Sequence, residues 1–174
     1  MKSLLEKTRK ITRTIQQKVG YQVDFNEMAE LVSEIMEATV YVFSNKGKLL
    51  GSAVYEQFGT SVLEDDVLAE ARLSVEFNQE LLKIDVTSAN LKGENQTLYN
   101  PEVVSPFADK NITIVPLAGG GERLGTLILA KADGEFTDAD LILAEYAATV
   151  VGLEIVRSRS DRLEDEVRKK AACQ

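Results

Sequence analysis

Apolar residues in the first part of the chain recur at the three- and four-residue intervals of an amphipathic helix. The first predicted helix covers residues 4–18 and ends before Gly20. Its apolar stripe consists of Leu4, Thr8, Ile11, Ile15 and Val19. Asp24 predicts the start of a second helix, with Glu27 three residues later as its capping partner. The buried stripe predicted for this helix is Phe25, Met28, Ala29, Val32, Ile35 and Met36.

The pattern then changes to β-branched and aromatic residues, which are typical of strands. Residues 39–43 predict one strand and residues 49–55 predict the next. Between them, Ser-Asn-Lys-Gly-Lys at residues 44–48 favours a turn, because Asn and Gly readily adopt positive φ. The sequence therefore predicts a β-hairpin here.

The middle of the chain has a weaker pattern. Residues 62–71 and 75–84 predict two short helices with a break near Leu73. Residues 86–110 are polar and predict irregular structure, with one short strand near residues 96–99. A loop of this length in a compact domain is usually functional or mobile.

The last part of the chain repeats the strand pattern and ends in a long helix. Residues 112–117 and 123–131 predict two strands joined by Ala118 and a glycine turn. Thr137 is the predicted cap of the last helix, which begins at Asp138 with acidic residues in its first turn. Its apolar face contains Leu141, Ala144, Ala148, Val151 and Ile155, and Leu163 and Val167 continue it. These residues belong either to the core or to a dimer seam, where Gly152 would permit close helix approach.

This order of elements predicts an α+β fold, in which an antiparallel sheet is flanked by helices. GAF and PAS sensor domains have this layout. The 174 residues fit one domain with a long helix attached, and the 44% hydrophobic content is sufficient for a core. The lone cysteine, Cys173, cannot form an internal disulfide. Together with the absence of a signal peptide or spanning apolar run, it predicts a cytoplasmic protein with no membrane partner.

Charge is distributed unevenly along the chain. The net charge is −8, but residues 1–20 carry six basic residues and one acid, so they hold +5 and the remainder holds −13. An acidic body repels the phosphate backbone, so this chain alone is predicted to bind DNA poorly. The basic first helix is interpreted as a solvated face, with pairing to an acidic surface as the alternative.

The composition argues against catalysis and metal binding. Without histidine there is no Ser-His-Asp or Cys-His arrangement and no histidine-containing zinc site, so we expect that the chain is not an enzyme and holds no metal. Gly119–Gly121 lacks the spacing of a phosphate-binding loop and is interpreted as a plain hairpin turn. The acidic run 64–66 lacks the pattern of a calcium loop and is interpreted as a solvated helix start.

Four stretches of the chain resemble the CodY-type global transcription regulators of low-GC Gram-positive bacteria. They are residues 4–11 (LLEKTRKI), 44–51 (SNKGKLLG), 119–129 (GGGERLGTLIL) and 138–154 (DADLILAEYAATVVGLE). The resemblance implies a GAF-type effector-binding domain over residues 1–136. Residues 137–174 would form a long helix leading to a winged helix-turn-helix domain beyond this chain. It also implies a homodimer that binds DNA through that further domain.

The resemblance implies that a branched-chain amino acid (isoleucine, valine or leucine) binds between the sheet and the middle helices and loop. By position, this pocket maps onto Val67, Leu73, Phe77, Thr97, Tyr99 and Pro101. Periodicity alone favours ordinary core positions for the first three. Relatives have an arginine near the start of the first middle helix, which pairs with the ligand carboxylate, whereas residues 60–64 here contain none. Arg72 or backbone N–H groups would have to replace it, or the pocket binds differently.

Many members of this family also respond to GTP. The contacts implied for GTP map onto Ser44, Lys46, Lys48 and Glu154, although turn solubility explains the first three equally well. The leading hypothesis is therefore the effector sensor of a dimeric transcription regulator. One alternative is a GAF module that dimerises without a ligand, which the absent arginine favours. The other is the sensor domain of a signalling enzyme.

Overall fold

The computed structural model describes residues 3–17, 24–55, 59–97 and 99–172, with residues 160–165 and 172 described by their backbone alone. The elements in chain order are α1 Leu4–Gln17, α2 Phe25–Met36, β1 Thr39–Ser44, β2 Leu49–Ala53, α3 Val62–Glu70, α4 Val75–Leu82, β3 Ser88–Lys92, the 3-10 helix η1 Gly93–Thr97, β4 Asn111–Gly119, β5 Glu122–Lys131 and α5 Asp138–Ala172. Both predicted hairpins and all five predicted α-helices are confirmed, with several boundaries shifted by a few residues. The predicted end of the first helix, with Val19 and Gly20, lies outside the described residues.

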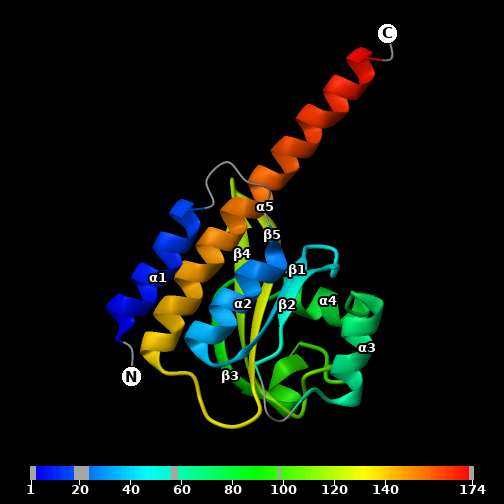
Figure 1. Ribbon diagram of the computed structural model, residues 1–174. Coiled ribbons are helices and arrows are strands. Elements are labelled where there is room, and N and C mark those ends of the chain that lie inside the picture. The colour runs from blue at the N-terminus through cyan, green and yellow to red at the C-terminus, as the bar shows by residue number, and fades with distance from the viewer. Residues whose placement is uncertain (1–2, 18–23, 56–58, 98, 173–174) are drawn as a thin grey trace.

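The strands form one antiparallel sheet in the order β2-β1-β5-β4-β3. Helices α1, α2 and α5 cover one face of this sheet, and α3 and α4 lie on the other side (Figure 1). This arrangement confirms the predicted α+β fold with a helix-flanked antiparallel sheet. The C-terminal part of α5 extends away from the body of the molecule (Figure 1).

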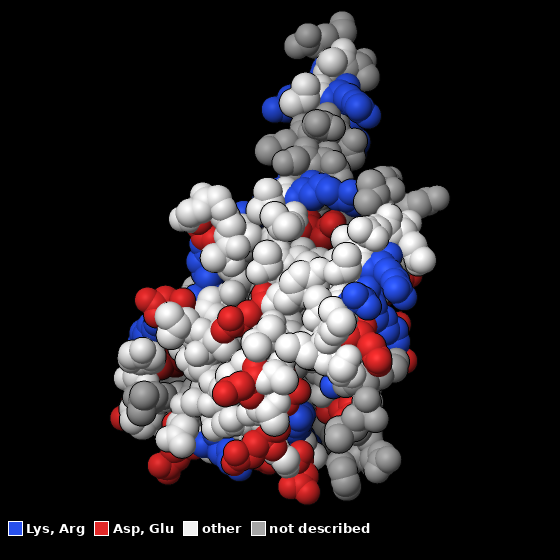
Figure 2. Space-filling view, turned by 90° about the vertical axis from the view of Figure 1, so that its left-hand side faces the viewer, with Lys and Arg blue, Asp and Glu red and all other residues white. Residues whose placement is uncertain are grey.

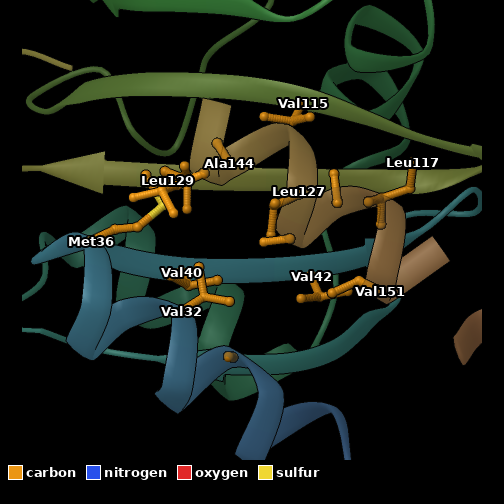
Figure 3. Packing of buried hydrophobic residues seen from close by; sticks show 14 of the residues in the cluster. Val32, Met36, Val40, Val42, Val115, Leu117, Leu127, Leu129, Ala144 and Val151 are labelled. Carbon is orange, nitrogen blue, oxygen red and sulfur yellow. The ribbon is translucent and has the colours of Figure 1, made fainter. Parts of the chain in front are cut away.

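The two faces of the sheet have separate cores, because successive side chains of a strand point to opposite sides. Val40 and Val42 of β1 point towards α2 and α5, where they join Leu127 and Leu129 of β5 (Figure 3). Tyr41 and the other intervening residues point towards α3 and α4. Four consecutive residues of β1 are buried, which is why its sequence reads as a continuous apolar run.

The glycine turn between β4 and β5 is a two-residue hairpin connection. Gly119 pairs with Glu122, and the intervening Gly120 and Gly121 have φ values of +62° and +77°. Positive φ at both central positions is what a type I′ turn requires, and glycine adopts it without steric cost. The interpretation of this segment as a plain turn is therefore confirmed.

Helix α5 begins at the predicted cap. The backbone N–H of Asp140 donates to the Thr137 hydroxyl at 3.2 Å, and the Thr137 N–H donates to the Asp140 carboxylate at 2.8 Å. Ala144, Ala148, Val151 and Ile155 of the predicted face pack into the core of this same chain, and Leu141 does so in part. Val167 is 67% exposed, and the side chain of Leu163 lies outside what the structure describes. Gly152 is buried there, and a Cβ at this position would lie 3.3 Å from the Ala118 carbonyl oxygen. Its small size therefore allows α5 to approach β4 within the molecule.

The prediction for residues 86–110 was wrong in detail. A strand forms at Ser88–Lys92, whereas Gln96 and Thr97 lie in the 3-10 helix instead of the strand predicted near residues 96–99. The pairing of β3 with β4 shifts register between Ser88 and Leu91, and Asn90 has a φ of +57°. This irregularity removes the alternation by which a short edge strand is recognised in a sequence.

Candidate functional site

A buried carboxylate lies at the start of α3. Glu64 is only 1% exposed, although α3 begins on the surface. The Tyr41 hydroxyl donates to Glu64 Oε2 at 2.6 Å, and the Ser61 N–H donates to Glu64 Oε1 at 3.3 Å. The interpretation of residues 64–66 as a solvated helix start is therefore wrong for Glu64, and holds for Asp65 and Asp66. Glu64 lies one helical turn before the buried Val67, on the face of α3 that packs on the sheet.

The surroundings of Glu64 suit a charged carboxylate. Burial raises the pKa of Tyr41, and the hydrogen bond to Glu64 and the nearby carboxylates raise it further. The phenol therefore stays protonated and acts as a donor. The Lys110 ammonium lies 3.9 Å from Glu64 Oε1, on a side chain that is 11% exposed. Donors and a nearby cation of this kind offset the cost of removing a carboxylate from water.

A cavity of about 140 Å³ opens beside Glu64 and Lys110. It lies where the beginning of β1, the end of β5 and the beginning of α3 meet. Its lining consists of Glu37, Ala38, Thr39, Tyr55, Gly59, Glu64, Lys110, Ala130, Lys131, Ala132 and Asp133. A volume of this size equals the liquid volume of roughly five water molecules, which is room for a small organic molecule.

The apolar residues predicted for a ligand pocket do not line this cavity. Val67, Leu73 and Phe77 are buried together in the core of the second face. The Phe107 ring lies among them, with its centroid 5.0 Å from that of Tyr41 and 6.0 Å from that of Phe77. Phe107 therefore occupies the space beside these residues.

The predicted polar residues of the pocket are spread over the loop between β3 and β4 and the end of α3. Thr97 is buried in η1, whereas Tyr99 and Pro101 are exposed. The Lys83 ammonium lies 5.8 Å from the centroid of the Tyr99 ring. Arg72 is exposed, and its backbone forms an isolated bridge with Lys48 on the first hairpin. The structure does not bring these residues together around one cavity.

A buried glutamine that the sequence did not single out organises this loop. The side-chain amide of Gln96 donates to the carbonyl oxygens of Leu91, Phe107 and Lys110 at 2.9–3.1 Å. The Ser105 hydroxyl donates to its side-chain oxygen. Gln96 thereby fixes the backbone positions of Phe107 and Lys110, the two loop residues nearest to Tyr41 and Glu64. No spacing within residues 86–110 marks this glutamine, because its partners follow only from the folded loop.

Arg123 fixes the turn after α4 against the sheet. Its guanidinium donates to the carbonyl oxygens of Ile84 at 2.7 Å, Leu81 at 3.2 Å and Gly125 at 2.6 Å. Burial lowers the pKa of Arg123, and the nearby Asp85 opposes this shift. A guanidinium suits this position because it offers several donors in a fixed planar arrangement.

The residues predicted for GTP fall into two places. The Ser44 hydroxyl accepts the backbone N–H groups of Lys46 at 3.3 Å and Lys48 at 3.1 Å, which closes the turn. Both lysine side chains are exposed. Glu154 lies on α5, where its carboxylate is 3.3 Å from the Arg157 guanidinium. No contact between Glu154 and this turn is found among the described residues.

The described residues contain neither a candidate membrane span nor a candidate metal cluster. None of the helices in that part of the chain has both the length and the apolar content needed to cross a bilayer. Within the same residues, no group of three or more His, Cys, Asp or Glu side chains is placed to hold a metal ion.

Comparison with known proteins connects this fold to a family. The family model described as the CodY GAF-like domain matches residues 3–174. The "Global transcriptional regulator CodY" of Thermoanaerobacter sp. (strain X514) is 49% identical over 176 residues, covering 100% of this chain and 66% of that relative. The protein of the same name from Brevibacillus brevis is 46% identical over 172 residues, with 98% and 66% coverage. This chain thus spans about two thirds of the length of these relatives.

A solved structure agrees with this match. It is described as the cofactor-binding GAF domain of the nutrient sensor CodY from Clostridium difficile. It is 42% identical, has a TM-score of 0.62, and covers 89% of this chain and 99% of its own. The names of these proteins describe regulators, in agreement with the expectation that the chain is not an enzyme. The chain belongs to the CodY GAF-like domain family.

Proposed function

We propose that this chain is the nutrient-sensing domain of a global transcriptional regulator, and that its effector is a branched-chain amino acid. The observation that carries this proposal is the 42% identity to a domain described as cofactor-binding, over 99% of that domain. The ligand would enter the second face of the sheet, under α3, α4 and the loop between β3 and β4. Val67, Leu73 and Phe77 would surround its aliphatic tail, with Thr97, Tyr99 and Pro101 in the loop above it.

Entry of the tail requires the loop to move, because Phe107 now fills the space between Tyr41 and Phe77. The loop is held by polar contacts to Gln96 and by the buried Phe107 ring, so the side chain of a bound ligand would have to replace the packing of this ring. A ligand that binds the opened loop better than the closed one shifts the population towards it. This change is the proposed signal.

The signal would pass along α5 to a DNA-binding winged helix in the third of the relatives' length that this chain does not match. In this division, residues 1–136 form the effector-binding domain and residues 137–174 form the connecting helix. The projecting end of α5 could transmit a movement of this domain to the DNA-binding domain (Figure 1). The excess acidic charge disfavours DNA binding by this chain itself, which supports a separate DNA-binding part. The whole regulator would act in the cytoplasm.

The outer side of α5 supports the proposed homodimer. Ile142, Leu153 and Val156 are 56%, 65% and 40% exposed. With Tyr146 and Thr149 they follow alternating four- and three-residue steps, which is the spacing of a two-helix seam. Figure 2 shows that this side of the molecule is mostly uncharged, with scattered acidic residues and with charged residues at the base of the projecting helix. A second copy of the chain would cover this stripe.

GTP is proposed as a second effector at the first hairpin turn. Lys46 and Lys48 present exposed ammonium groups on a turn that Ser44 rigidifies. Ammonium groups meet phosphate as point charges. The proposal predicts that Lys46→Ala weakens binding of a fluorescent GTP analogue, and unchanged binding would remove these residues from the site. Glu154 would contribute only if α5 or a second copy of the chain brings it near the turn.

Isothermal titration calorimetry of the chain with isoleucine tests the effector. We expect saturable binding of isoleucine, with valine and leucine competing, because one methylene changes affinity by only about 1–3 kcal/mol. Alanine is the control, and it should bind much more weakly. Absence of isoleucine binding at millimolar concentration would contradict the proposal.

The filled core around Phe107 favours a second candidate, a GAF module that dimerises and binds no small molecule there. Absence of binding together with dimer formation in analytical ultracentrifugation would support this candidate. Leu153→Glu should then convert the dimer to monomer, whereas Val62→Glu on the exposed side of α3 serves as the matched control. The signalling-enzyme alternative has no support in the relatives matched along the whole chain.

A further inference from the structure

An amino-acid effector carries two opposite charges, and both must find partners when water is removed. The start of α3 contains no arginine to bind the carboxylate. The structure instead places a buried carboxylate, Glu64, and a largely buried ammonium, Lys110, in the wall of one cavity. Their polarity matches a zwitterion bound in one orientation.

We propose that Glu64 binds the α-ammonium of the effector and that Lys110 binds its carboxylate, in the cavity between β1, β5 and α3. This assignment rests on the proposed function and replaces Arg72 as the ligand's cationic partner. Val67 does not line the cavity, but it follows Glu64 by one turn on the same face of α3. The side chain of a ligand held at Glu64 would reach Val67 when the loop opens as proposed above.

The side chains of Glu64 and Lys110 lie close together, but no hydrogen bond joins them. The distance of 3.9 Å from Lys110 Nζ to Glu64 Oε1 exceeds that of a hydrogen bond. An ammonium has three donors, and Lys110 Nζ makes no hydrogen bond to the described residues apart from ion pairs at 3.9 Å with Glu64 and Asp109. The N–H groups of the Lys110 ammonium are therefore available to donate hydrogen bonds to a ligand carboxylate.

Glu64 keeps acceptor capacity as well. Tyr41 donates to one of its oxygens, and Ser61 donates to the other. Each carboxylate oxygen accepts about two hydrogen bonds, and the Ser61 hydroxyl also donates to Oε1 at 3.3 Å. A ligand ammonium can therefore be added at Oε2 without breaking these contacts. Because Tyr41 and Ser61 are fixed by the sheet and by the helix cap, the carboxylate is held in place before the ligand arrives.

The other charged residues of the cavity are less suitable. The Lys131 ammonium lies 3.8 Å from Asp140 and 4.6 Å from the Phe136 ring centroid, and donates to the Glu135 carbonyl oxygen. Glu37 and Asp133 are exposed at the rim, where water screens their charge. Glu64 and Lys110 are therefore the charged pair that combines burial with access to the cavity.

The assignment predicts selectivity for intact α-amino acids. A 2-oxo acid lacks the ammonium and leaves Glu64 without its partner, and an amine lacks the carboxylate and leaves Lys110 without its partner. Sites built around hydrogen bonds reject analogues that leave buried polar groups unpaired. We expect 3-methyl-2-oxopentanoate and 2-methylbutylamine to bind at least about 100-fold more weakly than isoleucine.

The test is calorimetry of isoleucine and these two analogues with the wild-type chain and with Glu64→Gln, Lys110→Met and Arg72→Met. Glu64→Gln keeps the shape of the side chain and an acceptor for one of its two partners, Tyr41 or Ser61, and Lys110→Met keeps an unbranched apolar stem. We expect both variants to weaken isoleucine binding by about 100-fold, and Arg72→Met to bind like wild type. Circular dichroism and urea unfolding of each variant establish that it is folded.

The outcomes separate this assignment from the proposed function. If wild type does not bind isoleucine, the proposed function fails and the assignment falls with it. If wild type binds isoleucine but Lys110→Met binds equally well, the assignment is overturned and the function stands. Loss of binding in Arg72→Met alone would overturn it in favour of that arginine. Should Glu64→Gln fail to fold, Lys110→Met and the two analogues decide the result.

Discussion

The two faces of the sheet differ in what they bury. The face under α1, α2 and α5 is packed with aliphatic side chains, as Figure 3 shows for Val42, Leu127, Val151 and their neighbours. The face under α3 and α4 contains the aromatic cluster and also the buried carboxylates Glu64 and Glu80. The aliphatic first face offers few polar partners to a ligand, whereas the charged groups of the second face can pair with one. The first face is therefore suited to be a scaffold, and the second to respond to a ligand.

Neighbouring residues of β5 allow the sharpest test of this contrast. Leu127 and Ile128 are both fully buried, on the first and the second face respectively. We expect Leu127→Ala and Ile128→Ala each to lower the free energy of unfolding by about 2–5 kcal/mol in urea titrations. Only Ile128→Ala should change isoleucine affinity. Equal effects on affinity would show that the two faces are not functionally distinct.

Removal of the Arg123 guanidinium is expected to have the next largest effect. Arg123→Met leaves the carbonyl oxygens of Leu81, Ile84 and Gly125 without this donor. We expect a loss of about 3 kcal/mol in the free energy of unfolding, since hydrogen bonds from charged donors are the stronger ones. Hydrogen exchange should show the loss first in α4, and Arg72→Met is the exposed control. A stability equal to wild type would mean that water replaces the guanidinium.

The Tyr41 hydroxyl is the strongest fixed donor to Glu64. Tyr41→Phe removes it while keeping the ring that packs on Phe107, so we expect the free energy of unfolding to fall by about 1–3 kcal/mol. Thermal unfolding followed by circular dichroism measures this change. The double variant with Glu64→Gln is the control, because a neutral partner should reduce the penalty. A larger loss in the double variant than the two single losses combined would contradict the coupling.

A small effect is expected on the scaffold face at Gly152. Gly152→Ala gains about 1 kcal/mol of helix propensity, but its methyl would press against the Ala118 carbonyl oxygen at 3.3 Å. Overpacking costs about 1–3 kcal/mol, so we expect a net destabilisation of about 1 kcal/mol in urea unfolding. Isoleucine affinity should stay the same. A stabilised variant would show that α5 can move away from β4 freely.

Much of the fold could be predicted from the sequence because the features that determine it act between residues close together in the chain. The caps at Asp24 and Thr137 and the glycines of the second hairpin act on backbone groups a few residues away. The same holds for the amphipathic stripes of α2 and α5. Strand β3 escaped prediction because its pairing with β4 is interrupted at Asn90.

The candidate site was readable only in part. The pair Ser61 and Glu64 has the spacing of a capping box, so its local geometry follows from the sequence. That Glu64 is buried depends on Tyr41, which lies 23 residues earlier and meets it across the sheet. The closeness of Lys110 depends on the loop fixed by Gln96. The periodicity of the sequence indicates neither the burial of Glu64 nor the closeness of Lys110 to it.

The sequence by itself determined the order and type of most elements, the overall α+β architecture and the resemblance to one family, since short-range hydrogen bonding and side-chain periodicity act along the chain. Only the tertiary structure decided which polar residues became buried and which charges came together. Those outcomes depend on contacts between distant segments, where the cost of burying a charge is offset by partners that no local pattern reveals.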